Sequence, residues 1–113
     1  MQIDERREGQ IIILAPHGAW DAATAPAFKE RASALVAAGS IRFAIDFSHV
    51  EFIDSSALGS LVSLYKKVKP TLDGDVKLFA LAPDIHVIFR ETRLDRVFQI
   101  SPTLEEAIRS FPT

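Results

Sequence analysis

The five consecutive apolar residues from Ile11 to Ala15 constrain the fold of this chain more than any other feature. In a strand, neighbouring side chains point to opposite faces of the sheet. A strand that is apolar on both faces therefore belongs in the interior of a sheet that is covered on both sides. The segment Gln2–Arg7 is predicted to pair with it as an antiparallel edge strand, through a turn at Glu8-Gly9.

Helical and strand patterns alternate along the rest of the chain. The predicted helices begin near Thr24, Asp54, Pro83 and Thr103, and the predicted strands between them are Ile41–Phe47, Val76–Leu81 and Val97–Ile100, with Phe52-Ile53 placed in a loop. This alternation predicts right-handed parallel crossovers. We therefore expect residues 1–113 to form one α/β domain, with a mixed, mostly parallel sheet, an N-terminal antiparallel hairpin and about four covering helices.

The composition excludes several classes of function. The chain is 48% hydrophobic and 25% charged, which is typical of folded domains. A net charge of −2 is no footprint for nucleic acid or for an anionic membrane. No apolar run is long enough to enter a membrane, and the N-terminus has no apolar signal segment. We expect a soluble, cytoplasmic protein that inserts into no membrane.

Little in the sequence indicates catalysis. The histidines His17, His49 and His86 are scattered, and the chain has no cysteine, so we expect no metal site. No phosphate-binding loop or nucleophile elbow is present, so we expect no cofactor and no catalytic residues. The remaining enzymatic alternative is a small hydrolase that uses Ser55 with His49.

The most informative segment is Phe52–Ser60, which follows the predicted strand Ile41–Phe47. In open α/β sheets, functional sites form at the carboxyl ends of the strands. Asp54, Ser55 and Ser56 are all able to cap a helix, and the simplest interpretation is an ordinary N-cap. Since one cap needs only one of the three, we expect a hydroxyl to be left facing solvent.

A strip of small residues follows on the same predicted helix. Ser56, Gly59, Ser60 and Ser63 recur three or four residues apart, which suits close packing and suits a docking face for a partner. If the strands before Asp21 and Asp54 are parallel neighbours, the loop with Asp21 and Thr24 emerges beside this strip. The apolar stripe of the same helix is predicted to be Leu58, Leu61, Val62, Tyr65 and Val68.

Four segments resemble one family. Asp54–Gly59 resembles the D-S-S/T-G-L-G signature of STAS domains of the anti-sigma factor antagonist type. Gly18–Ala25 is similar to the family's G-x-L-D-x-x-T-A, and the segments Ala82–Phe89, Leu94–Phe98 and Thr103–Ala107 are similar to its later motifs. Ala57 departs from the signature, where glycine is commonest, and its methyl group would crowd a partner or stiffen the helix start.

The resemblance implies a switch without catalysis. Ser55 would be the phosphoacceptor of a partner that is both an anti-sigma factor and a serine-protein kinase of the histidine-kinase-like ATPase type. A PP2C-type phosphatase would reverse the modification. The unphosphorylated form would bind the partner and release its target, through Asp21, Thr24, Asp54, Ser56, Gly59, Ser60 and Ser63. The alternative is a constitutive adaptor in lipid transport, a stressosome, or secretion or biofilm regulation, in which the serine is only a cap.

Overall fold

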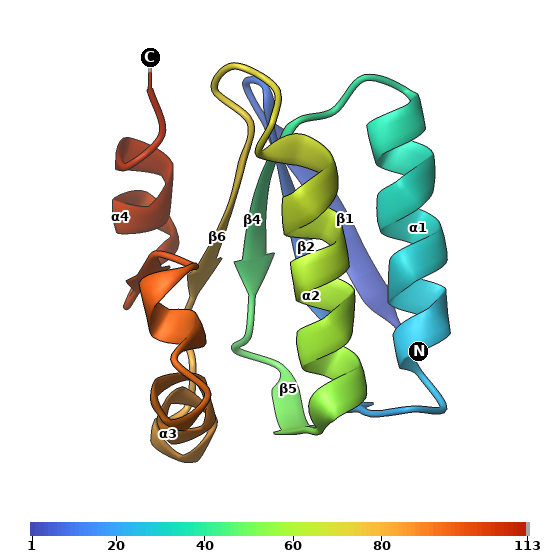
Figure 1. Cartoon of the computed structure of the whole chain (residues 1–113), viewed down its shortest axis with the longest axis vertical. Helices are drawn as coiled ribbons and strands as arrows, with labels where there is room; N and C mark the ends of the chain where they lie inside the picture. Colours follow the sequence, from blue (N-terminus) through green and yellow to red (C-terminus); the bar gives the residue numbers. More distant parts are fainter. Residues whose placement is uncertain (113) are drawn as a thin grey trace.

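A five-stranded sheet forms the centre of the computed structural model, which describes residues 1–112 (Figure 1). Its strands, in spatial order, are β1 (Ile3–Glu8), β2 (Ile11–Pro16), β4 (Arg42–Asp46), β6 (Asp75–Phe79) and β7 (Ile100–Ser101). The pair β1–β2 is antiparallel and the other neighbours are parallel, which confirms the predicted mixed sheet. The connecting helices are α1 (Ala25–Ala37), α2 (Ser55–Val68), α3 (Pro83–Glu91) and α4 (Leu104–Arg109).

The N-terminal hairpin forms where the sequence predicts it. Glu8 pairs with Ile11 around a two-residue loop, in which Gly9 has a φ of +59°. Such loops match the twist of the strands and favour glycine, because other residues rarely adopt a positive φ. This turn sets the register that places β1 at the edge of the sheet.

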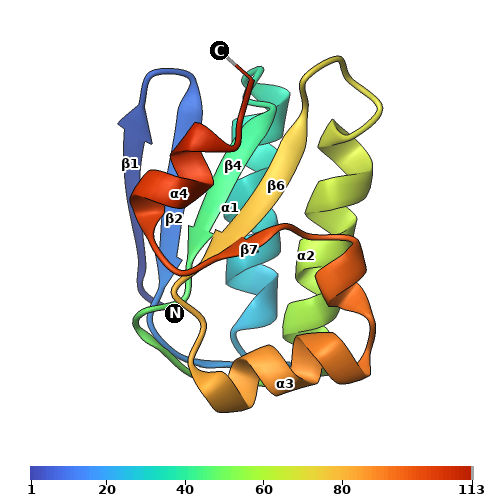
Figure 2. The ribbon, with the colours of Figure 1, turned by 90° about the vertical axis from the view of Figure 1, so that its left-hand side faces the viewer.

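The apolar run of β2 is divided between two cores. Ile12 and Leu14 belong to the larger core, whereas Ile11 and Ile13 belong to a smaller one. The larger core lies under α1 and α2, and the smaller core packs Ala107 and Phe111 of the C-terminal segment against the opposite face. Figures 1 and 2 show these layers, with α1 and α2 on one side of the sheet and α4 on the other.

Two short strands lie where the sequence predicts none. β3 (Gly18–Trp20) and β5 (Val50–Ile53) form a separate two-stranded parallel sheet. The loop predicted at Phe52-Ile53 is therefore wrong. Trp20 and Ile53 are paired and buried, while Ala19 and Phe52 are paired and exposed. The Trp20 indole is 0% exposed. Its burial depends on tertiary contacts, and a strand of three residues is too short to show a recognisable pattern in the sequence.

The C-terminal strand and the α2 stripe also differ from expectation. The segment Leu94–Arg96 is a turn of 3₁₀ helix, and β7 is displaced to Ile100–Ser101 from the predicted Val97–Ile100. On α2, Leu64 is buried although it lies outside the predicted stripe, and Leu58 is only half-buried. The buried side of α2 is turned toward α1, because the helix packs against α1 as well as against the sheet.

Candidate functional site

The β3–β5 pair joins the two segments that the sequence singles out. Trp20 lies opposite Ile53, and the backbone N–H of Asp54 donates to the Trp20 carbonyl over 3.4 Å. β2 and β4 are parallel neighbours, as the prediction of a common edge requires. The loop after β3 and the start of α2 therefore lie together, at the lower end of the molecule in Figure 1.

Internal hydrogen bonds hold the loop that carries Asp21 and Thr24. The Thr24 hydroxyl donates to the Ala19 carbonyl and accepts from the Asp21 N–H, both at 2.9 Å. The Asp21 carboxylate accepts from the Ala23 N–H at 3.0 Å. Thr24 occupies the N-cap position of α1, but its side chain makes no capping bond to the helix. The helix therefore begins near Thr24 as predicted, and the side chains of Asp21 and Thr24 shape the loop before it rather than capping it.

The start of α2 separates the three cap-capable residues by role. Asp54 is the N-cap, and its carboxylate accepts from the Ser56 N–H at 2.8 Å. Ser55 is the first helical residue and is exposed, whereas Ser56 is half-buried. Because Asp54 supplies the cap, the Ser55 hydroxyl is free for other chemistry.

The strip of small residues divides into a surface part and a buried part. Gly59 is exposed, and a Cβ built on it would meet no atom within 4 Å. Ser60 is only 2% exposed, and its hydroxyl donates to the Ser56 carbonyl at 2.9 Å. The expectation that Ser60 lies on a docking face is therefore wrong. Its side chain turns toward α1, where a small residue allows the two helices to approach.

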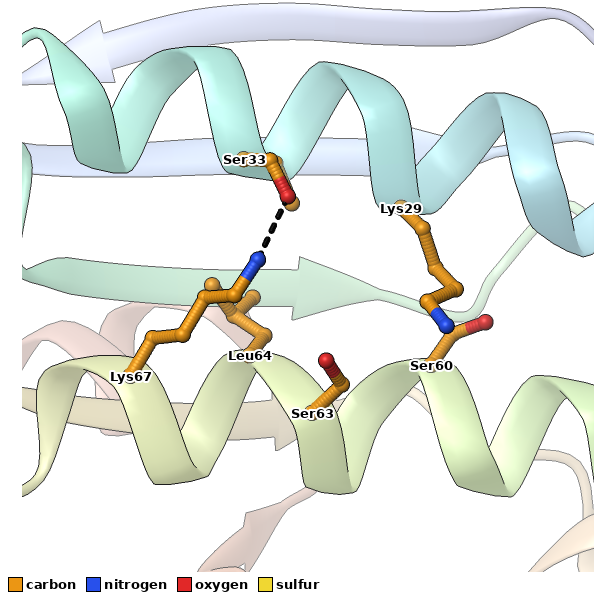
Figure 3. Close-up of a pocket in the computed structure, with 7 residues that line it drawn as sticks. Lys29, Ser33, Ser60, Ser63, Leu64 and Lys67 are labelled. Carbon is orange, nitrogen blue, oxygen red and sulfur yellow. Dashed lines mark hydrogen bonds between the residues drawn. The ribbon is translucent and has the colours of Figure 1, made fainter.

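Two lysines, Lys29 and Lys67, also border this strip, and the pattern of small residues gives no sign of them. Lys29 of α1 lines a hollow with Ser56 and Gly59, and it also lies near Ser60 and Ser63 in the groove between the helices. Figure 3 shows this groove, with the Lys67 ammonium donating to the Ser33 hydroxyl at 2.6 Å. Lys29 lies four residues after Ala25 and three before Ala32, which are both buried on α1. This helical spacing places Lys29 beside the buried face of α1, and it is the sequence signal that could have located it.

Acidic and basic residues near the start of α2 belong to different elements. Asp54 adjoins Ser55 in sequence and Glu51 lies on the preceding strand β5, while Lys29 of α1 lines a hollow with the neighbouring Ser56. The first turn of α2 presents backbone N–H groups and the positive end of the helix dipole. An anion attached at Ser55 would therefore be tolerated by the helix.

The histidine needed for a hydrolase is engaged elsewhere. The His49 ring stacks on His17 at a centroid distance of 4.3 Å and lines hollows that include no Ser55 atom. His17 contacts the Asp4 carboxylate at 2.8 Å. Hydrogen bonds from Gln2 and from His17 lower the pKa of Asp4. The geometry supports a stacked surface pair and gives no support to a Ser55–His49 couple.

These features define a mixed-sheet α/β domain whose polar loops and exposed helix start gather at one end. The chain belongs to the STAS domain family, whose model matches residues 2–107. STAS domains of this kind are in general interaction modules rather than enzymes. Among residues 1–112, no helix has both the length and the apolar character needed to cross a membrane.

Solved structures share this fold over nearly the whole chain. A Thermotoga maritima protein described as an anti-sigma factor antagonist is 24% identical, with a TM-score of 0.91 and coverage of 96% of this chain and 93% of that one. An anti-sigma factor antagonist from Mycobacterium paratuberculosis is 27% identical, with a TM-score of 0.88 and coverage of 97% and 92%. The phosphorylated form of Bacillus SpoIIAA is 18% identical, with a TM-score of 0.75 and coverage of 96% and 97%.

Proposed function

We propose that this chain is a phosphorylation-switched interaction module whose phosphoacceptor is Ser55. The observation that carries the proposal is the exposed Ser55 hydroxyl on the first residue of α2, next to an Asp54 that already caps the helix. The likeness to anti-sigma factor antagonists supports it, since SpoIIAA has been solved in both phosphorylated and unphosphorylated forms.

Modification at this position changes a surface and leaves the fold in place. A phosphoserine adds a charge of about −1.5 to −2. Backbone N–H groups of the first turn and the helix dipole stabilise that charge locally. A docked partner instead meets a bulky, hydrated dianion at the centre of its contact, so binding ends while the helix persists.

The proposed partner is an anti-sigma factor that is also a serine-protein kinase of the histidine-kinase-like ATPase type. The unphosphorylated module binds it and releases its target, and a PP2C-type phosphatase restores the module after phosphorylation. Six of the residues expected at this surface keep that role in the proposal: Asp21, Thr24, Asp54, Ser56, Gly59 and Ser63. Ser60 is left out because it is buried.

The test is to incubate the purified chain with ATP and each kinase of this type from its own organism, and then to map the phosphopeptides. Phosphate on Ser55 is the expected result, and a Ser55→Ala variant should take up none. Ser56→Ala is the matched control and should remain a substrate. Phosphate confined to Ser56 would overturn the assignment.

A constitutive adaptor is the second candidate function. STAS-like folds also occur within transporters, including a sulfate transporter family protein and an anion transporter. In that case Ser55 would carry no phosphate in cells, and Ser55→Asp would leave partner binding intact. Mass spectrometry of the protein isolated from its own cells separates the two functions.

A further inference from the structure

β1 is a six-residue strand at one side of the sheet, and no strand among residues 1–112 pairs with its outer edge. Figure 2 shows β1 as the outermost strand of the sheet. The opposite edge is different, because β7 has only two residues. Free edges of this length are templates for a further strand, and proteins normally block them with proline, a bulge or charged side chains. Five of the six β1 residues are charged, but with both signs, so a strand with the complementary charge pattern can still pair with it. β1 has no proline, and its pairing with β2 runs without a register shift.

The hairpin register determines which backbone groups of β1 face outward. The Gln2 carbonyl accepts from the His17 N–H at 3.0 Å, so Gln2 and every second residue after it bond toward β2. The N–H and C=O groups of Ile3, Glu5 and Arg7 therefore point away from the sheet. These three residues are the ones that a further strand would hydrogen-bond.

We propose that β1 is a docking edge for a second copy of this chain, giving one sheet that is continuous across two molecules. A two-fold axis perpendicular to the sheet at Glu5 pairs Ile3 with Arg7 of the second copy and Glu5 with its own counterpart. In this antiparallel register each outward N–H faces an outward C=O.

The side chains of the same register are complementary in charge. Asp4 lies opposite Arg6 of the second copy, and Arg6 lies opposite Asp4 of that copy. Both are non-hydrogen-bonded pairs, in which facing side chains come closest. Asp4 and Arg6 border an open hollow on the face of the sheet that carries Ile13 and Ala15. The Asp4 carboxylate already contacts Gln2 and His17 within its own chain, so pairing with Arg6 of the second copy adds to these contacts or replaces them.

At the centre of this register, Glu5 lies opposite Glu5 of the second copy, and an arginine of its own chain compensates the charge of each. Each Glu5 is held by Arg31 of α1 through two hydrogen bonds of 2.6 and 2.8 Å, and Arg7 of the second copy lies diagonally across from it. Sliding by one pair would instead place Arg6 opposite Arg6 and Asp4 opposite Glu8. Like charges directly opposite are destabilising, so the sequence favours the register centred on Glu5.

β1 contains neither Ser55 nor any residue of the proposed partner-binding surface. Dimer formation through β1 can therefore be tested separately from partner binding. Sedimentation velocity on the full chain, over concentrations up to about 1 mM, measures the association directly. We expect a monomer–dimer equilibrium. Asp4→Arg and Arg6→Asp should each raise the dissociation constant about tenfold, and the double variant, with the charges exchanged, should restore it.

Two further variants separate edge pairing from general charge effects. Arg7→Pro removes an outward N–H without touching the bonds to β2, so it should abolish the dimer while the fold persists. Arg96→Asp, on the distant 3₁₀ turn, makes the same charge change as Arg6→Asp and should leave the dimer intact. A monomer at all concentrations overturns the proposal. So does a dimer that withstands both single reversals, or one that the charge exchange fails to restore. If Arg7→Pro does not fold, the charge-exchange series decides.

Discussion

At the scale of single residues, the adjacent side chains of Asp54 and Ser55 have different roles at the start of α2. Asp54 caps the helix through the Ser56 N–H, and Ser55 is exposed beside it. Ser55→Ala should therefore change the free energy of unfolding by less than about 0.5 kcal/mol. Asp54→Ala, the matched control, should cost about 1 kcal/mol. Urea unfolding of both variants checks this, and a larger loss from Ser55→Ala would show that the Ser55 hydroxyl does support the helix.

The same position should act as a switch when it is charged. Ser55→Asp should keep the unfolding midpoint of the wild type, because an acidic residue is favourable in the first helical turn. It should weaken binding to the cognate kinase about tenfold or more, since it places a charge within the contact. Calorimetric titration of the kinase measures the effect. Binding as tight as wild type in a folded variant would favour the constitutive adaptor.

A third residue-scale expectation concerns pH. Hydrogen bonds from Arg31 lower the pKa of Glu5 below its usual range. A carboxyl whose pKa is lower in the folded state stabilises the fold at pH above its unfolded pKa, and this contribution is lost as pH falls through the folded value. Wild type should therefore be more stable than Glu5→Gln at neutral pH, and the difference should begin to shrink below about pH 4 and be lost once the folded carboxyl is protonated. A difference that persists unchanged at pH 2 would contradict the ion pair.

At the scale of elements, α2 presents an open position within the proposed docking surface. Gly59→Arg should unfold no earlier than wild type, because glycine costs about 1 kcal/mol in a helix and open space surrounds its Cβ. The bulky side chain should nevertheless block the partner. Thermal unfolding and a binding titration on the same variant decide the matter. Undiminished binding would move the interface away from this face of α2.

Gly74, in the turn between α2 and β6, has no room for a side chain, in contrast to Gly59. A Cβ on Gly74 would lie 1.9 Å from the Val68 carbonyl oxygen, so any side chain must displace the end of the helix. Gly74→Ala should cost about 1–3 kcal/mol of stability. Gly59→Ala is the same substitution in open space and should stabilise the protein. Denaturant midpoints of the two variants should shift in opposite directions, and shifts of the same sign would refute this packing.

At the scale of the whole molecule, the switch should be local. Trp20, the only tryptophan, is fully buried beneath the loop and packs on Phe28 and Phe47 with ring centroids 4.6 and 5.7 Å away. Phosphorylation at Ser55 should leave this cluster intact, so the emission spectrum and the circular dichroism should be unchanged. A red-shifted emission after phosphorylation would mean that the core opens and that the switch is conformational.

The sequence by itself determined the layered architecture and the position of the main elements. The apolar run of β2, the hairpin turn at Gly9 and the helix start near Thr24 are strong local signals, and the structure follows each. The helix start predicted near Thr103 also holds, since Thr103 is the N-cap of α4 and its hydroxyl accepts from the Glu106 N–H at 3.3 Å. In these segments local preference and burial agree, so pattern alone is sufficient.

Only the tertiary structure decided what surrounds the candidate site. β3 and β5 are too short to show a pattern, and they exist because they pair with each other over a buried Trp20. Gly59 and Ser60 are both small residues of the same predicted strip. The way α2 packs against α1 leaves Gly59 exposed and buries Ser60. Lys29 reaches the strip from another helix. Each outcome depends on contacts between segments far apart along the chain, and local periodicity holds no information about such contacts.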